Sequence, residues 1–221
     1  MLKSYIIILG DDQMKITKDI NPAIFRAYDL RGLADVDLND DVVYTLGKSY
    51  GSYVKQNGHY KVVIGHDNRL SSERIFKALT SGIRETGVAV IDLGLVTTPM
   101  YYYAKIYYNI PTGIMITASH NPKEDNGLKM SFSEIGNAYG ELIQEFKKFT
   151  FQGEFITAKM GEIIKADIKN AYLDNLKKCL NFGPRKVKVV ADCGNGTASI
   201  IIKEALDLFD LDYELLYCQS D

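Results

Sequence analysis

The sequence predicts an α/β protein with a mixed, mostly parallel sheet sandwiched by helices, because short apolar runs alternate with longer amphipathic segments. Residues 61–65, 88–93 and 113–117 are apolar runs too short for helices, and they are typical of buried strands. Helical patterns lie between these runs, over residues 71–87 and 99–108. This β-α-β-α-β order favours parallel strands joined by crossover helices.

A further helix is expected before the first of these strands. Apolar residues recur at helical spacing over residues 38–57, and Asn57-Gly58 ends the pattern. In the helix that follows residues 61–65, Ser71 or Ser72 is the expected N-terminal cap.

The alternation of strand-like and helix-like segments continues in the second half of the chain. A helix is expected over residues 139–149, and a stretch of mixed character follows it. Beyond it we expect, in order, a helix near 167–180, a break at 181–184, a strand at 186–191, a helix at 197–209 and a strand at 213–217.

We divide the chain into an N-terminal extension (1–19), a first domain (20–155) and a second domain (156–221). Two strands rarely make a stable sheet alone. We therefore expect the first domain to be complete and the second to be truncated, so that this chain is a fragment or packs on a missing part. In the extension, an apolar run is too short for a typical signal peptide, and Met14 is an alternative initiator.

Composition excludes several classes of function. Lys and Arg number 26 and Asp and Glu number 28, so the net charge of −2 gives no reason to expect nucleic acid or a membrane as a partner. Three widely spaced cysteines without a CxxC pair support neither a zinc site nor a disulfide framework. We expect reduced thiols and a cytoplasmic protein.

The most informative stretch is residues 117–122, which follow a buried strand at the sheet edge where α/β proteins bind ligands. Ser119 is expected in this turn, and Asn126-Gly127 in a second turn. An isolated Ser-His pair is usually only a turn. Here Lys129 follows on the same segment, and two more basic segments, 26–31 and 67–69, are also expected in turns. Phosphoryl transfer needs such a hydroxyl with nearby cations and a proton shuttle.

Residues 117–122 resemble the phosphoserine loop of the α-D-phosphohexomutases. Further segments similar to that family are residues 126–129, 25–32, 65–71 and 191–196. Their common order over about residues 20–218 makes the resemblance specific. The segment 25–32 is most similar to the phosphomannomutase/phosphoglucomutase branch, which implies mannose or glucose phosphates as substrates. Phosphoglucosamine mutase stays the alternative.

The resemblance implies a role for Ser119 as a phosphorylated serine. It would transfer its phosphoryl group to a hexose monophosphate and form a hexose 1,6-bisphosphate, which then returns the other phosphate. The net reaction interconverts hexose 1-phosphate and hexose 6-phosphate. The family's Mg²⁺ would bind through the Ser119 phosphate, while its aspartate loop has no counterpart here, because no Asp-x-Asp-x-Asp run occurs.

The resemblance also implies roles for four neighbours. His120, Lys129 and Arg31 would serve catalysis, and Tyr28, Arg31 and Lys129 would bind the sugar phosphate. His120 as a packed turn residue and Tyr28 as a core aromatic are the alternatives.

Three other features have plain structural interpretations. Asp67 and Arg69 are equally well explained as a local ion pair. Residues 194–196 favour a tight strand-to-helix turn over a phosphate loop. The tyrosines at 101–103 and 107–108 favour packing in the core and at an interface.

Two functional hypotheses follow. The chain is part of an active mutase completed by a longer reading frame or by a second chain that supplies the missing domains, or it is a non-catalytic remnant or binding module. In either case we expect the chain to be inactive alone.

Overall fold

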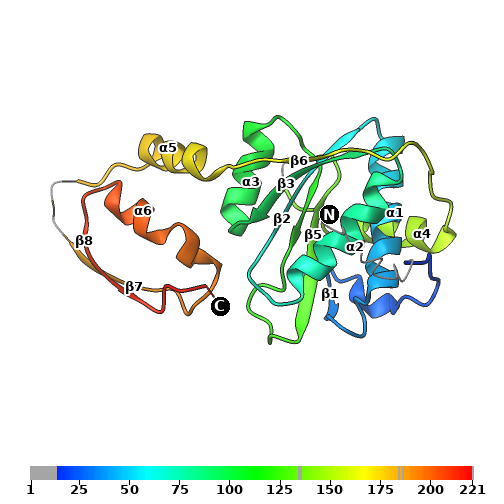
Figure 1. The fold of residues 1–221 in the computed structure, drawn as a ribbon, viewed down its shortest axis with the longest axis horizontal. Helices are drawn as coiled ribbons and strands as arrows, with labels where there is room; N and C mark the ends of the chain where they lie inside the picture. The colour runs from blue at the N-terminus through cyan, green and yellow to red at the C-terminus, as the bar shows by residue number, and fades with distance from the viewer. Residues whose placement is uncertain (1–13, 134–135, 184, 186, 221) are drawn as a thin grey trace, which may run out of the picture.

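Two strands lie at the centre of the fold, β2 (Lys61–His66) and β4 (Gly113–Ile116), and they pair in parallel (Figure 1). Within the part of the chain that the structure describes, they belong to a six-stranded sheet in the order β1-β5-β4-β2-β3-β6. The other four strands are β1 (Leu30–Leu33), β3 (Ala89–Leu95), β5 (Asp125–Ser131) and β6 (Ile163–Lys165), of which β1 and β6 form the edges. The neighbours β2/β3 and β3/β6 are parallel, and β1/β5 and β4/β5 are antiparallel. The predicted mixed, mostly parallel sheet is confirmed.

The computed structural model describes residues 14–133, 136–183, 185 and 187–220. Residues 1–13 of the expected N-terminal extension lie outside the described residues, as do positions 184 and 186 at the break and at the start of the next strand. The last part of the expected extension packs on the fold, because the Lys15 backbone N–H donates to Asp41 Oδ1 at 2.8 Å.

Helices cover both faces of the sheet because apolar residues alternate along its strands. Val62 and Ile64 belong to the core formed with α1 (Asp40–Gln56), α2 (Ser72–Arg84) and α4 (Glu141–Gln152). Val63 and Met115 face the other way, into the core formed with α3 (Thr98–Tyr107) and α5 (Lys169–Cys179). The sheet is therefore the middle of three layers.

Helices α1 and α2 touch backbone to backbone. A Cβ added at Gly47 would lie 2.2 Å from the Leu79 carbonyl oxygen, and one added at Gly82 would lie 2.3 Å from the Tyr44 carbonyl oxygen. Only glycine fits at these two positions, so the pair sets how closely the helices approach. The predicted stop at Asn57 is confirmed, and Gly58 follows with φ +83°.

Ser71 is the N-cap residue of α2, as predicted, but its side chain makes no capping hydrogen bond. Ser72 Oγ donates to Asp67 Oδ1 at 2.6 Å, and Ser71 Oγ accepts from Asn126 Nδ2 at 2.8 Å. The two hydroxyls instead connect the start of α2 to the ends of β2 and β5, which is where the site lies.

Two turn predictions are corrected. Asn126-Gly127 lies inside β5 rather than in a turn, and Arg31 lies in β1 rather than in a turn. The two strands pair, with Arg31 opposite Gly127. Asn-Gly on its own is typical of a turn. Here residue 127 must be glycine, because a Cβ there would collide with the backbone carbonyl oxygens of Leu30 in β1 and of Thr117.

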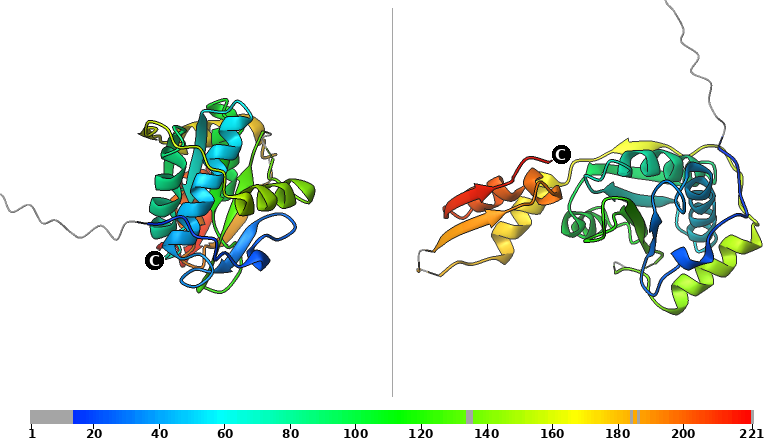
Figure 2. Two further views of the ribbon diagram at one scale, coloured as in Figure 1. Left: turned by 90° about the vertical axis from the view of Figure 1, so that its right-hand side faces the viewer. Right: turned by 90° about the horizontal axis from the view of Figure 1, so that it is seen from below.

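Residues beyond 166 form a second, smaller unit. It contains α5, β7 (Lys188–Asp192), the 3-10 helix η2 (Thr197–Ile200), α6 (Ile202–Asp207) and β8 (Asp212–Leu216). In the described residues, β7 and β8 form a separate two-stranded parallel sheet. Figure 2 shows the two units side by side, joined by the segment between β6 and α5.

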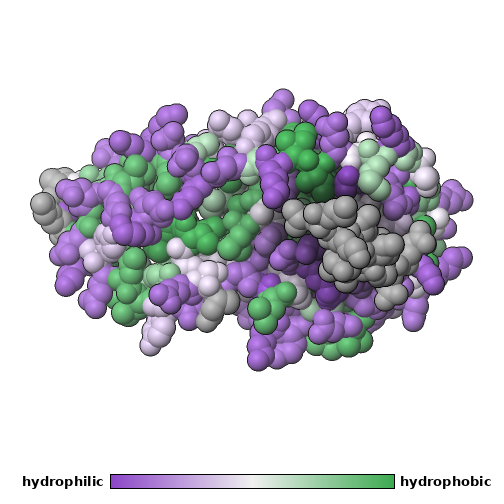
Figure 3. Space-filling view, in the orientation of Figure 1, coloured by the Kyte–Doolittle hydropathy of each residue, from purple (hydrophilic) through white to green (hydrophobic). Residues whose placement is uncertain are grey.

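The two units meet at α3 and α5. The Tyr103 and Tyr172 rings lie 5.7 Å apart and Tyr101 is fully buried, so these tyrosines pack at the interface and in the core as predicted, whereas Tyr107 is 55% exposed. On the face shown in Figure 3, apolar side chains gather between α6 and α3. The boundary near 155 stays a prediction, and the segment just after it packs on the first unit, since the Ile156 N–H donates to Ser52 Oγ at 2.8 Å.

No helix in the described part of the chain is both long and apolar enough to cross a bilayer.

The buried side chain of Lys105 is expected to make the free energy of unfolding depend on pH. Its side chain is 1% exposed, donates to Ser131 Oγ at 2.6 Å and lies over the Tyr101 ring. Burial lowers the pKa of Lys105 to about 8. Between pH 8 and 10.5 the unfolded chain holds a proton that the folded chain has lost, so stability rises with pH.

We therefore expect the stability of the wild type, relative to Lys105→Met, to rise by up to about 1.4 kcal/mol for each pH unit above 8. Urea unfolding at pH 7, 8 and 9 measures it. Lys61→Met removes an exposed lysine and is the control, with a difference that stays flat. Parallel pH profiles for the wild type and Lys105→Met would contradict the prediction.

Candidate active site

Ser119 lies in the turn that leaves β4. The Thr117 N–H donates to the Gly127 carbonyl at 2.9 Å, and Thr117 Oγ1 accepts from the Ser119 N–H at 2.9 Å. Ser119 has φ +58°, a left-handed conformation unusual for a non-glycine residue, and it is exposed. Its Oγ lies 3.3 Å from His120 Nδ1. The turn therefore presents a hydroxyl to solvent with an imidazole beside it.

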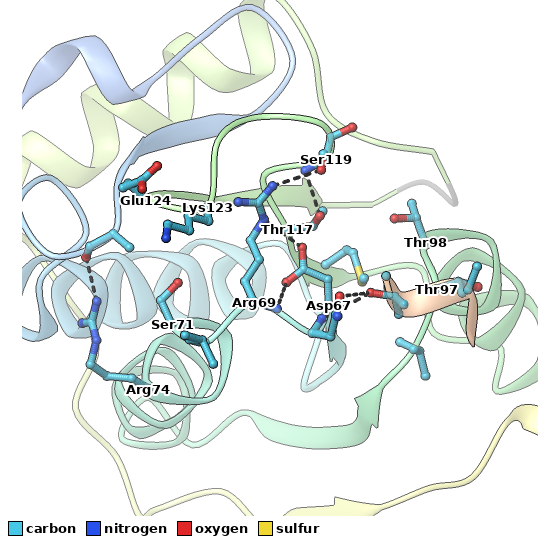
Figure 4. Close-up of a pocket in the computed structure, with 18 of the residues that line it drawn as sticks. Asp67, Arg69, Ser71, Arg74, Thr97, Thr98, Thr117, Ser119, Lys123 and Glu124 are labelled. Atoms are coloured by element: carbon cyan, nitrogen blue, oxygen red, sulfur yellow. Dashed lines mark hydrogen bonds and ion pairs between the residues drawn. The ribbon is translucent and has the colours of Figure 1, made fainter. Parts of the chain in front are cut away.

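Arg69 binds the backbone of this turn at four points. Its Nη1 donates to the carbonyls of Pro122 and Asp125 at 2.6 and 3.0 Å. Its Nη2 donates to the carbonyls of Ser119 and Asn121 at 3.1 and 2.7 Å. Figure 4 shows the guanidinium on the carbonyl side of the turn, with the Ser119 side chain pointing away from it.

Asp67 orients that guanidinium. Its Oδ2 lies 3.4 Å from Arg69 Nε, and its Oδ1 accepts from the Arg69 N–H and from Ser72 Oγ. The local ion pair predicted for these residues is present. The partners of Arg69 in the turn lie 50 to 56 positions away along the chain, so its wider role has no local sequence signal.

A second group of charges lies beside β1 and β5. Arg31 is 5% exposed and donates from Nη2 to Asp29 Oδ2 at 2.5 Å. Lys129 Nζ lies 3.8 Å from the same oxygen and 5.5 Å from the centre of the Tyr28 ring. Asp29 is 2% exposed, so a buried carboxylate holds both cations together. Asp29 lies in the segment 25–32, and no role was predicted for it.

The two charge groups meet at Asn121. Its Oδ1 accepts from Arg31 Nη1 at 2.8 Å, and its Nδ2 donates to Asp125 Oδ2 at 2.7 Å. Arg31 therefore reaches the turn through a side chain, while Arg69 binds its carbonyls. The turn that carries Ser119 is held by both arginines.

Ser119 and Arg69 line a cleft of about 1010 Å³ between the two units. The first unit contributes Thr97, Thr117 and Lys123, and the second contributes residues 196–198. The units touch there, because Asn68 Nδ2 donates to the Asn195 carbonyl at 2.9 Å and Thr197 Oγ1 donates to Asn68 Oδ1 at 2.9 Å.

Residues 194–196 form the predicted tight turn. Gly194 and Asn195 have φ +51° and +53°, and the Gly196 N–H donates to the Cys193 carbonyl at 2.8 Å.

The structure thus brings Ser119 and His120 together, and it joins Arg31, Lys129 and Tyr28 into a neighbouring group. Tyr28 is 55% exposed, so it is not a core aromatic. Arg69, Asp29 and Asn121 complete the arrangement as residues that position the turn and its cations.

The described residues do not by themselves fit a Mg²⁺ ion. Among them, no three or more His, Cys, Asp or Glu side chains are arranged to hold a metal. Two carboxylates of the site, Asp29 and Asp67, are bound to arginines.

Comparison with known proteins gives a consistent family. The profile of "Phosphoglucomutase/phosphomannomutase, alpha/beta/alpha domain I" matches residues 22–157. A phosphomannomutase/phosphoglucomutase of Pseudomonas syringae pv. tomato is 35% identical over 90% of this chain, and a phosphoglucomutase of Neisseria gonorrhoeae is 32% identical over 93% of it. A crystal structure of a phosphoglucomutase/phosphomannomutase family protein from Burkholderia thailandensis superposes on 91% of this chain, with a TM-score of 0.83 and 31% identity.

The chain spans less than half the length of these similar proteins. It covers 42% and 44% of the two relatives and 45% of the crystallised chain.

The four carbonyl contacts of Arg69 predict a loss of rigidity in Arg69→Lys. An ammonium keeps the charge but cannot reproduce a planar fork that reaches four acceptors. We expect the opening free energy of residues 118–126 to fall by about 1–3 kcal/mol, measured by hydrogen exchange of their amides.

Arg74→Lys is the matched control, because Arg74 binds the carbonyls of Leu38 and Ala34 in a different loop. Its effect should appear near residues 34–38 instead. Equal exchange at residues 118–126 in both variants would show that Arg69 does not hold the turn.

Proposed function

Because the chain belongs to the phosphoglucomutase/phosphomannomutase family, we propose that it provides the phosphoryl-carrying serine of a hexose-phosphate mutase, with Ser119 in that role. The observation that carries this proposal is the position of the Ser119 hydroxyl. It projects into solvent from a turn held by two arginines, at the carboxyl end of a buried parallel strand.

The reaction we propose is a reversible phosphoryl transfer. The bond between phosphorus and Ser119 Oγ breaks, and a bond forms to a free hydroxyl of a hexose monophosphate, which gives a hexose 1,6-bisphosphate. The sugar hydroxyl loses its proton and Ser119 Oγ gains one. The other phosphate then returns to Ser119, so phosphate moves between O1 and O6. His120 lies 3.3 Å from the serine oxygen and is our candidate for moving the proton.

The cations of the site suit a phosphoserine, which carries about −2 charge. We assign Arg31 and Lys129 to the phosphate groups and Tyr28 to the sugar face. Asp29 already orients Arg31 and Lys129, so they need not rearrange to meet an incoming anion. Preorganised charge of this kind lowers the barrier for transfer.

The activity of the whole protein stays part of the proposal, because the chain covers less than half of the relatives. Mg²⁺ and hexose 1,6-bisphosphate are expected participants, with metal ligands from outside the described residues. A second chain or a longer reading frame would supply the remaining domains. The relatives are named for glucose and mannose phosphates, which favours these two sugars. A cytoplasmic location stays a prediction.

Ser119→Ala tests the proposal in the protein isolated from its source. We expect mass spectrometry to find phosphate on the peptide that contains Ser119, and the variant to lack it. Conversion of mannose 1-phosphate or glucose 1-phosphate to the 6-phosphate should fall by at least about a thousandfold.

Ser81→Ala, in the last turn of α2, is the control and should keep both phosphate and activity. The proposal fails if residue 119 never bears phosphate and Ser119→Ala leaves the conversion unchanged. Phosphate at residue 119 without any conversion would favour the non-catalytic binding module.

A further inference from the structure

Two thiols lie against each other at the end of the small sheet. Cys193 follows β7 and Cys218 follows β8, and their sulfur atoms are 2.9 Å apart. Both cysteines are free and half-buried, so small reagents can reach them. Cys179 lies elsewhere, exposed on α5, where its thiol faces Asn175 Oδ1.

The backbone holds this pair in a suitable position for a covalent bond. Asp192 and Leu216 are paired across the two parallel strands, and the Cys193 N–H donates to the Leu216 carbonyl at 3.0 Å. A disulfide has an S–S distance of about 2.05 Å. The sulfurs therefore need to approach by less than about 1 Å to reach it.

We propose that Cys193 and Cys218 are a dithiol site that forms a reversible intramolecular disulfide by exchange with a low-molecular-weight disulfide. The bond fastens the end of the two-stranded sheet and the turn at residues 193–197, which is a wall of the cleft.

The exchange takes two balanced steps. The Cys218 thiolate attacks one sulfur of the small disulfide, which releases one small thiolate and leaves a mixed disulfide on Cys218. The Cys193 thiolate then attacks the Cys218 sulfur and releases the second small thiolate. Two protein thiols lose two protons and two electrons, and the small disulfide is reduced to two thiols.

The order of attack follows from the surroundings of the thiols. Burial, together with the adjacent Cys218, raises the pKa of Cys193 to about 11. Cys193 is therefore the resolving thiol, and ring closure is expected to accelerate as pH rises toward that value.

The site connects to the cleft through a few contacts. The Asn195 N–H donates to the Tyr217 carbonyl at 2.7 Å, directly before Cys218. Asn195 and Thr197 in turn bind Asn68, the residue between Asp67 and Arg69. A covalent link at residues 193 and 218 thus restrains the turn that contacts the base of the Ser119 site. A two-stranded sheet is weak alone, so it has the most to gain from such a link.

Oxidised glutathione applied to the 221-residue chain tests the proposal. We expect peptide mapping to find residues 193 and 218 linked, and the intact mass of the Cys179→Ser variant, which lacks the exposed third thiol, to fall by two hydrogens. Amide exchange over residues 193–197 should slow by at least about tenfold. Cys179→Ser is the matched control and should form the same link. Cys193→Ser and Cys218→Ser should stop at a mixed disulfide, and reduced glutathione should remove every change.

The proposal is overturned if residues 193 and 218 stay open to alkylation while only Cys179 takes up glutathione. A link that forms without slowing exchange in the turn overturns the effect on the cleft wall. Hydrogen exchange in β2 and β4 checks that each serine variant is folded. The readouts are covalent and structural, so their failure is distinct from failure of the proposed role of Ser119.

Discussion

The guanidinium of Arg69 binds the carbonyl oxygens of residues 119, 121, 122 and 125, and the geometry of the site depends on this interaction. A turn between an incoming and an outgoing strand leaves several carbonyls without ladder partners, and each one needs a donor. The Arg69 guanidinium is rigid and has five N–H donors, and it donates to four of these carbonyl oxygens at once. The turn can then hold Ser119 in a left-handed conformation, which costs about 1–3 kcal/mol, and keep its hydroxyl outside the hydrogen-bonded frame.

The charges around the site are organised by two carboxylates rather than left free. Asp67 orients Arg69, and Asp29 holds Arg31 close to Lys129. In the described structure, Asp29 Oδ1 and Arg31 Nε are buried without a hydrogen-bond partner. A buried unsatisfied polar atom costs about 1–3 kcal/mol. Arg31 Nε is a donor that a bound anion can satisfy, whereas Asp29 Oδ1 is an acceptor and needs an N–H or O–H donor instead.

The sequence predicted the buried strands and the amphipathic helices because their signals are local. β5 escaped prediction because Asn126-Gly127 is typical of a turn, and only the approach of β1 shows why glycine is needed there. β6 was not predicted, because its three residues are all exposed and form no apolar run typical of a buried strand. In the site, Ser119 and Lys129 could be chosen from one segment and its resemblance. The role of Arg69 could not, because its acceptors are backbone atoms that carry no sequence signal.

The turn at residues 67–69 connects the two units of the chain mechanically. Asp67 and Arg69 face the Ser119 turn, while Asn68, between them, faces residues 195 and 197 of the second unit. A shift of the second unit that displaced Asn68 would also move the neighbouring backbone of Arg69, and with it the Arg69 guanidinium. The second unit has only a two-stranded sheet among its described residues, so its own rigidity limits how firmly it fixes Asn68. Whatever stiffens that sheet, covalently or by added strands, therefore also steadies the base of the Ser119 site.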